Sequence, residues 1–300
     1  MFEVSYAINI LKPKGADNMG TKVNGKIIVE NYRNEIKSVI SEGAAMGLRV
    51  PSIKTILVGE DGGSLSYVKS QNNLCDKLGV SYSCVHLDSE VDEKYIIDII
   101  EKFNEDNSVD GIILQLPLPK KFNEKEITSR ISYKKDIDGL TDKNMGRFYK
   151  GEKCFMPCTA LGVIEMIKNI GCVIKGKHAV VIGRSNIVGK PAAQLLLNED
   201  ATVTICHSKT LNLKEICKTA DIIVAAIGKP GFVTSDFIKE GAVVIDVGTT
   251  MINGKITGDV CFEDVIDHAS YVTPVPGGTG LMTTTMLIKN ACEAWRNNVY

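Results

Sequence analysis

The chain has 300 residues, with 35 basic and 36 acidic side chains and a net charge of −1. This balance gives no general attraction to nucleic acid or to an anionic membrane, and the length favours two domains over one. No apolar run reaches the ~18 residues of a membrane span. The first fifteen residues lack the basic start, apolar run and cleavage site of a signal peptide, so we expect a cytoplasmic protein with no membrane or nucleic-acid partner.

Nine cysteines, an odd number, are scattered without a Cys-x-x-Cys pair. Several lie within apolar strand or helix patterns, which favours reduced core thiols over zinc ligands or disulfides. His86, His178 and His268 have no partners at metal-ligand spacing. We therefore expect structural histidines and no metal site.

Short apolar strands alternate with helical patterns in the first half of the chain. A strand at 55–59 ends in glycine, and a helix from Ser64 to Leu78 is stopped by Gly79. Next come a strand at 82–87, a helix with isoleucines at helical spacing from Ile96, and a strand at 111–114. Such alternation indicates a mainly parallel α/β domain, which we place at residues 1–155.

The second half repeats this alternation and predicts a Rossmann-like, doubly wound domain at residues 156–282. Its predicted strands are 179–182, 202–206, 222–227 and 243–247. Its predicted helices start near Pro191, Asn212 and Ser235. A final helix, about 283–296 within the segment 283–300, is expected to pack back on the first domain.

A glycine-bearing turn, Gly183 to Pro191, joins the first strand of this second domain to a helix. Small residues let the backbone approach a phosphate, and a helix N-terminus can receive it, although such turns also use glycine for structural reasons alone. The next strand ends in His207-Ser208-Lys209, without the acid that an NAD site uses for the ribose 2′-hydroxyl. Arg184 and Ser208 instead suit a 2′-phosphate, which predicts NADP as the cofactor.

Three further segments carry candidate site residues. Gln115 is the one hydrogen-bonding side chain at the end of an apolar strand, which favours a ligand contact over a Gln that ties down its own loop. Asp136 and Asp138 precede a glycine, a pattern more typical of an Asx-turn than of a catalytic pair. The loop 273–280 has two prolines and three glycines, and its composition fits a binding loop and a tight turn equally well.

Jointly, these segments resemble one family, the bifunctional methylenetetrahydrofolate dehydrogenase/cyclohydrolases. Segments that match in family order between about Gly25 and Trp295 are 66–68, 110–119, 135–139, 156–159, 183–191, 206–210, 228–231, 258–260 and 273–280. The resemblance implies a two-domain α/β homodimer with a folate cleft between the domains. It also implies oxidation of 5,10-methylenetetrahydrofolate to the methenyl cation, with hydride transfer to NADP, in one-carbon metabolism. Residues before Met19 have no family counterpart, so Met19 is an alternative start.

The resemblance also assigns roles to single residues. Tyr67 would stack on the folate ring, and Gln115 and Asp138 would hold the pterin edge. The other implied folate contacts are Leu114, Leu116, Pro276, Gly277 and Gly278. The implied cofactor contacts are Gly183, Arg184, Ser185, Ser208 and Thr249. The chain departs from the family near this last residue, where Thr249-Thr250 replaces an Ile-Asn pair.

A second departure concerns the catalytic position that Gln71 occupies. In the family a lysine four residues after the stacking tyrosine transfers the proton of the cyclohydrolase step, and here that residue is Gln71. Tyr67 and Gln71 share a helix face, whereas Lys69 points ~200° away from Tyr67. An amide has no titratable proton near pH 7, so we expect dehydrogenase activity with weak or absent cyclohydrolase activity.

Three alternatives stay open at this point. Another group or solvent could supply the proton, which would leave the enzyme fully bifunctional. A shikimate-type NADP dehydrogenase would need a different polar constellation in the first domain. A non-catalytic NADP-binding sensor would bind the cofactor without turnover.

Overall fold

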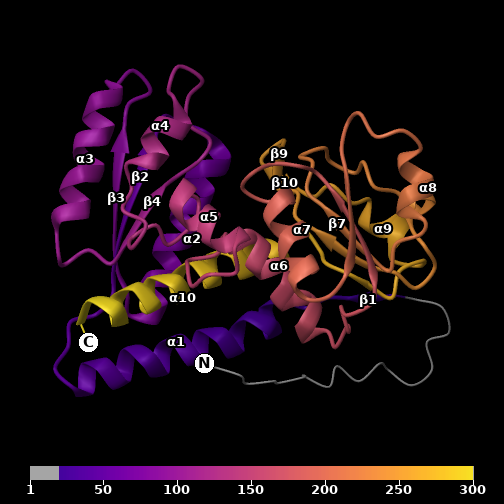
Figure 1. Ribbon diagram of the computed structural model, residues 1–300, viewed down its shortest axis with the longest axis horizontal. Coiled ribbons are helices and arrows are strands. Elements are labelled where there is room, and N and C mark those ends of the chain that lie inside the picture. Colours follow the sequence, from indigo (N-terminus) through magenta and orange to yellow (C-terminus); the bar gives the residue numbers. More distant parts are fainter. Residues whose placement is uncertain (1–19, 300) are drawn as a thin grey trace. The chain divides into compact units, whose positions relative to one another are not determined.

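The computed structural model describes residues 20–299 as two compact α/β units (Figure 1). The three-stranded unit contains residues 30–158 and 284–299, and the six-stranded unit contains residues 20–29 and 159–283. Residues 20–29, which the sequence placed with the first domain, thus group with the six-stranded unit. The start of the expected first domain and the alternative start at Met19 lie outside the described residues.

The three-stranded unit is built on a parallel sheet in the order β3-β2-β4. Its strands are β2 (Ser52–Val58), β3 (Ser81–Leu87) and β4 (Gly111–Leu114). The helices with residues in this unit are α1 (Gly25–Ala45), α2 (Gly62–Leu78), α3 (Glu93–Glu105), α4 (Glu124–Ser129), α5 (Asp142–Tyr149) and α10 (Thr279–Val299). The parallel sheet that strand–helix alternation predicted is confirmed.

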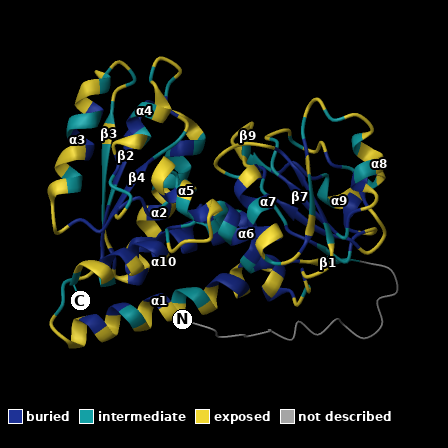
Figure 2. Ribbon diagram, viewed as in Figure 1, coloured by how far each residue is buried: buried dark blue, intermediate teal, exposed yellow. Residues whose placement is uncertain are grey.

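Apolar side chains on the two faces of this sheet explain the helix positions. Ile56 and Leu114 point from β2 and β4 into a core that isoleucines of α3 and α4 complete. Helix α2 packs against β2 and β3 and buries Leu74 and Leu78. Gly79 ends α2 with a left-handed φ of 77°, as the sequence predicted. Figure 2 shows the result: β2 and β4 are mostly buried, the residues of β3 are partly exposed, and the helices are buried on one side.

The six-stranded unit is a parallel sheet in the order β1-β11-β8-β7-β5-β6. Its strands are β1 (Thr21–Lys22), β5 (His178–Ile182), β6 (Thr202–Cys206), β7 (Ile222–Ala225), β8 (Val243–Asp246) and β11 (Tyr271–Val272). The α-helices α6 (Cys158–Asn169), α7 (Gly189–Asn198), α8 (Leu213–Cys217) and α9 (Phe262–Val265) belong mainly to this unit. From β5 the chain passes to β6 on one side and then to β7 on the other, the doubly wound arrangement that the sequence predicted.

Two local details differ from the sequence prediction. The helix expected from Ser235 is a single 3-10 turn, Ser235–Phe237, which buries Phe237. A short antiparallel hairpin, β9 (Thr250–Ile252) with β10 (Lys255–Thr257), follows β8. Asn253 and Gly254 connect its strands with positive φ angles, the geometry that an Asn-Gly hairpin turn requires.

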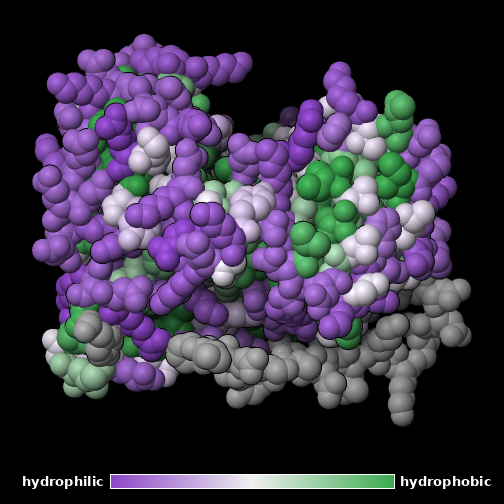
Figure 3. Space-filling model, viewed as in Figure 1, coloured by the Kyte–Doolittle hydropathy of each residue, from purple (hydrophilic) through white to green (hydrophobic). Residues whose placement is uncertain are grey.

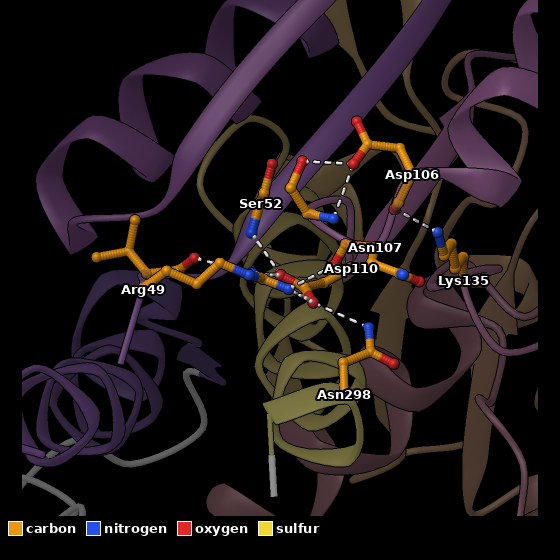
Figure 4. A network of polar contacts seen from close by, with 9 residues as sticks. Arg49, Ser52, Asp106, Asn107, Asp110, Lys135 and Asn298 are labelled. Atoms are coloured by element: carbon orange, nitrogen blue, oxygen red, sulfur yellow. Dashed lines mark hydrogen bonds and ion pairs between the residues drawn. The ribbon is translucent and has the colours of Figure 1, made fainter. Parts of the chain in front are cut away.

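A buried carboxylate ties together distant parts of the three-stranded unit (Figure 4). Asp110 precedes β4 and its side chain is fully buried. Its carboxylate accepts hydrogen bonds from the two terminal guanidinium nitrogens of Arg49, at 2.5 and 2.8 Å. It also accepts the backbone N–H of Ser52 at 2.9 Å and the amide of Asn298 at 2.9 Å. One charge therefore joins the starts of β2 and β4 to the end of α10.

A second buried charge, the ammonium group of Lys135, caps the C-terminal end of α3. The Lys135 Nζ donates to the carbonyls of Phe103, Asn104 and Asp106 at 2.7 to 2.9 Å. The first two carbonyls lie in the last turn of α3 and the third belongs to its C-cap residue, Asp106, where helix geometry leaves acceptors unpaired. Lys135 therefore has a structural role in this unit.

Among residues 20–299 no helix is both long and apolar enough to cross a bilayer. The nine cysteines, all within this range, carry free thiols, and five of them are buried. No group of three or more His, Cys, Asp or Glu side chains in the described range is placed to hold a metal ion.

Close packing between α1 and α10 gives a stability prediction. A Cβ on Gly43 would overlap the Trp295 ring, which is 1% exposed. Gly43→Ala should lower the free energy of unfolding by about 1–3 kcal/mol, because an overpacked core must shift. Gly146→Ala, also in a helix but with no atom near the new Cβ, is the matched control and should be neutral or stabilising by about 1 kcal/mol. Equal denaturant midpoints for the two variants would contradict the prediction.

Candidate active site

Two of the predicted site residues, Gln71 and Gln115, touch each other. The Gln71 Nε2 donates to the Gln115 Oε1 at 3.3 Å, and the Gln115 Nε2 donates to the Leu116 carbonyl at 3.1 Å. Gln71 is 6% exposed and lies in the third turn of α2, whereas Gln115 follows the carboxyl end of β4. The helix and the strand thus converge on one polar cluster.

A third member of this cluster, Tyr82, was missed by sequence reasoning. Its hydroxyl donates to the Gln71 Oε1 at 3.0 Å from the neighbouring strand β3. A large polar aromatic residue at the start of a short strand was the only available signal. Nothing in the sequence related it to Gln71, eleven residues earlier.

Tyr67 lies one turn before Gln71 on α2 and is half-buried, whereas Lys69 is exposed. This agrees with the shared face expected for Tyr67 and Gln71 from helical spacing. Lys69 is therefore unsuited to replace a proton-transfer group at position 71.

The carboxylates Asp136 and Asp138 have different environments. Asp136 accepts the backbone N–H groups of Leu140 and Thr141 at 3.1 and 2.8 Å and the Asn144 amide at 2.8 Å. It organises a turn, as its sequence pattern favoured. Asp138 does not share these contacts, and Cys158 provides its hydrogen bonds.

Burial raises the pKa of Asp138 to about 6, and the nearby Asp136 carboxylate adds to the rise. Asp138 is thus ionised at neutral pH and can accept hydrogen bonds from ring and amino N–H groups. A parallel bridge between Ile112 and Asp136 continues the sheet beside β4. Asp138 and Gln115 therefore both follow the carboxyl edge of the sheet.

The segment around Asp138 is held from two sides. The Asn290 amide of α10 donates to the Ile137 carbonyl at 2.9 Å and to the Cys158 Sγ at 3.3 Å. Gly139 has a left-handed φ of 71°, and a Cβ there would overlap the backbone at 155–157. The glycine after Asp138 is therefore required by the turn itself.

In the six-stranded unit, the turn after β5 lies where the chain order reverses between β5 and β7, the position at which doubly wound sheets bind nucleotides. Gly183 has a φ of 134°, and a Cβ on it would overlap the Ala226 carbonyl. A Cβ on Gly189 would overlap the Gly183 carbonyl. Close approach of backbone to backbone therefore explains both glycines, the structural reading that the sequence had left open.

Ser185 caps the helix that follows this turn. Its Oγ accepts the N–H groups of Val188 and Gly189 at 3.2 and 3.3 Å. Two of the N–H groups that the sequence offered to a phosphate are thus satisfied within the chain. The hydroxyl hydrogen of Ser185 remains available as a donor.

Arg184 and Ser208 are both exposed and follow neighbouring strands. The Gly183 N–H donates to the Cys206 carbonyl at 2.9 Å, which joins the turn after β5 to the end of β6. No acidic residue stands between Cys206 and Thr210. A cation and a hydroxyl group thus flank the ends of these two strands.

The glycine loop after β11 is bonded to the end of β8. The Asp246 N–H donates to the Thr273 Oγ1, and the Thr279 hydroxyl donates to the Asp246 carbonyl, both at 2.7 Å. Pro276 is exposed on this loop and Gly278 is buried. The predicted contacts on this loop, Pro276, Gly277 and Gly278, therefore follow the carboxyl edge of the sheet.

A buried carboxylate supports the neighbouring loop after β8. The Asp246 side chain accepts the N–H groups of Gly248, Asp259 and Val260 at 2.8 to 3.0 Å. Burial raises its pKa to about 6. The exposed residue Thr249, one of the implied cofactor contacts, directly follows this anchored turn.

Two family models and several known proteins match nearly all of this chain. The catalytic-domain model of tetrahydrofolate dehydrogenase/cyclohydrolase matches residues 23–138, and the NAD(P)-binding-domain model matches residues 157–299. The relative named Bifunctional protein FolD in Clostridium novyi is 59% identical over 275 residues, which cover 92% of this chain and 99% of the relative.

Solved structures extend the similarity to three dimensions. FolD of Campylobacter jejuni, a methylenetetrahydrofolate dehydrogenase/cyclohydrolase, is 39% identical with a TM-score of 0.89 over 93% of this chain and 99% of that one. The enzyme of Trypanosoma brucei, complexed with NADP and an inhibitor, is 34% identical with a TM-score of 0.90 over 94% and 99%. Shikimate dehydrogenase of Aquifex aeolicus, at 15% identity and a TM-score of 0.53, shares the fold alone. The chain therefore belongs to the tetrahydrofolate dehydrogenase/cyclohydrolase family.

Proposed function

We propose that this protein is an NADP-dependent methylenetetrahydrofolate dehydrogenase of one-carbon metabolism, with little or no cyclohydrolase activity. The observation that carries the proposal is the contact between Gln71 and Gln115 beside Tyr67, in a chain whose two halves both match the family. Its products would feed purine and amino-acid biosynthesis. Nine free thiols support a cytoplasmic location.

The three-stranded unit supplies the folate contacts of this proposal. Tyr67 offers an aromatic face for the pterin ring. The Asp138 carboxylate and the Gln115 amide suit its amino, ring N–H and carbonyl groups, and Leu114 and Leu116 flank Gln115. Oxidation removes a hydride from the methylene carbon and needs no proton transfer. These residues therefore need only to bind and align the substrate.

The six-stranded unit supplies the cofactor contacts. NADP, when bound, accepts the hydride. Gly183 and Ser185 form a tight turn with a free hydroxyl donor, which fits a pyrophosphate, and Arg184 with Ser208 fits the 2′-phosphate. Thr249 and the loop 276–278 would line the nicotinamide end.

A spectrophotometric assay tests the proposal. Purified protein with methylenetetrahydrofolate and NADP should form NADPH, and shikimate should give none. Absence of NADPH with the folate would reject the proposed function. NADPH formed only with shikimate would favour a shikimate-type dehydrogenase. NADP binding without turnover of either substrate would favour a non-catalytic sensor.

The cofactor preference depends on Arg184. A charge-assisted contact to phosphate is worth about 1.5–3 kcal/mol, so Arg184→Ala should raise the KM for NADP at least about tenfold and leave the KM for NAD nearly unchanged. Lys218→Ala, another exposed cation of the same unit, is the control. Equal or better efficiency of the native protein with NAD would show that the preference is wrong.

A substitution at Gln71 tests the expected loss of cyclohydrolase activity. Gln71→Lys should increase enzyme-dependent hydrolysis of methenyltetrahydrofolate by about 10²–10⁴-fold, because it restores a group that can transfer a proton. Ser70→Lys, which adds a lysine to the exposed face of α2, should have no such effect. The measurement follows decay of methenyltetrahydrofolate absorbance, corrected for the spontaneous rate. Native hydrolysis as fast as NADPH formation would instead show a bifunctional enzyme.

The proposed homodimer would form through β6. This strand is an edge of the six-stranded sheet, and Ile205 on it is 42% exposed; Leu197 and Leu211 of the same unit are exposed as well. Apolar surface gathers on the visible face of this unit (Figure 3). Edge strands with apolar side chains tend to pair with another chain.

Ile205→Lys should convert the dimer to a monomer in sedimentation equilibrium, because charge at an edge strand opposes pairing. Val173→Lys, at another exposed apolar position of the same unit, should leave the dimer intact. A monomeric native protein would contradict the homodimer itself. A dimer that persists with Ile205→Lys would contradict only its location.

A further inference from the structure

We propose that Tyr82 is a positioning residue of the folate site, whose hydroxyl completes a hydrogen-bond chain through Gln71 and Gln115 and holds it in place. This chain determines how the Gln115 amide is presented to the substrate. The proposal rests on the proposed function, since it names a residue that acts on the same site through its neighbours.

The chain has four members in one direction. The Tyr82 hydroxyl donates to the Gln71 Oε1, the Gln71 Nε2 donates to the Gln115 Oε1, and the Gln115 Nε2 donates to the Leu116 carbonyl. The donor-to-acceptor distances are 3.0, 3.3 and 3.1 Å. Each amide thus accepts on one side and donates on the other.

The Leu116 end of the chain sets its direction. The Leu116 carbonyl can only accept, so the Gln115 nitrogen must face it and the Gln115 oxygen must face Gln71. If the Gln71 amide alone turned over, two carbonyl oxygens would lie 3.3 Å apart with no hydrogen between them. In this orientation the oxygen of the buried Gln71 needs a donor on its other side, and the Tyr82 hydroxyl is that donor.

Tyr82 is suited to donate at every pH of interest. Burial raises the pKa of its phenol well above the usual range, and the neighbouring Thr55 side chain opposes this rise only in part. The hydroxyl is therefore protonated whenever the protein is folded near neutral pH. Its ring is half-buried on β3, so its position is set by the sheet.

A fixed direction leaves Gln115 with a defined capacity for a ligand. One of its amide hydrogens is used by Leu116, and its oxygen already accepts from Gln71. One hydrogen and one lone pair remain on the amide. That pattern suits a heterocycle edge with an acceptor next to a donor, as in the carbonyl and ring N–H of a pterin, and disfavours an edge with two donors.

The test compares Tyr82→Phe with Tyr95→Phe. Tyr82→Phe keeps the ring and removes only the hydroxyl, so the Gln71 amide loses its donor. We expect the KM for methylenetetrahydrofolate and the dissociation constant of tetrahydrofolate, measured by calorimetry, to rise about three- to tenfold. The kcat should change less than about twofold, and the KM for NADP should not change. Tyr95, which is 51% exposed on α3, is the matched control and should leave all four values unaltered.

A double-mutant cycle separates positioning from packing. In a Gln71→Met background the chain is already broken, so adding Tyr82→Phe should have no further effect on folate affinity. An equal loss in both backgrounds would mean that Tyr82 acts through packing alone, and would overturn the inference. Native-like folate affinity in Tyr82→Phe would overturn it as well. Native protein that forms no NADPH would count against the proposed function instead, and tetrahydrofolate calorimetry would still decide the role of Tyr82.

Discussion

Parallel strand pairing is the constraint on which the rest of this structure depends. Because every strand of both main sheets runs the same way as its neighbours, each sheet has one edge where all its strands end. The loops that leave this edge bring together residues far apart in sequence. Gln115 and Asp138 follow that edge in one unit, and Arg184 and Ser208 follow it in the other. The order of the strands decides which loops are neighbours, and so which side chains can act on one ligand.

Buried carboxylates hold these loops in place, and their hydrogen bonds distinguish structural acids from the candidate functional one. Asp110, Asp136 and Asp246 are each buried and each accept several N–H groups. Bonds of this kind compensate the loss of hydration and leave little capacity for a ligand. Asp138, in contrast, is held by Cys158 and by a segment that Asn290 secures. A carboxylate that is positioned by its surroundings, with few bonds of its own, is suited to bind a substrate.

Gln71 fits its surroundings. A glutamine there connects a donor, the Tyr82 hydroxyl, to an acceptor, the Gln115 oxygen, and so completes a polar cluster inside the unit. The family relationship accounts for the folds of the two units, but it does not by itself decide whether the chain has dehydrogenase activity, cyclohydrolase activity or both. Local chemistry decides that, because hydride removal needs alignment whereas hydrolysis needs a group that can transfer a proton.

The sequence by itself determined the features that depend on a few neighbouring residues. Strand–helix alternation predicted parallel sheets, and helical spacing placed Tyr67 and Gln71 on one face. Motifs in family order identified the family. Only the tertiary structure decided that Ser235 starts a single 3-10 turn, that β1 joins the far edge of the six-stranded sheet, and that Tyr82 donates to Gln71. Local patterns are written in adjacent residues, whereas these contacts depend on the register and packing of elements that are distant in the chain.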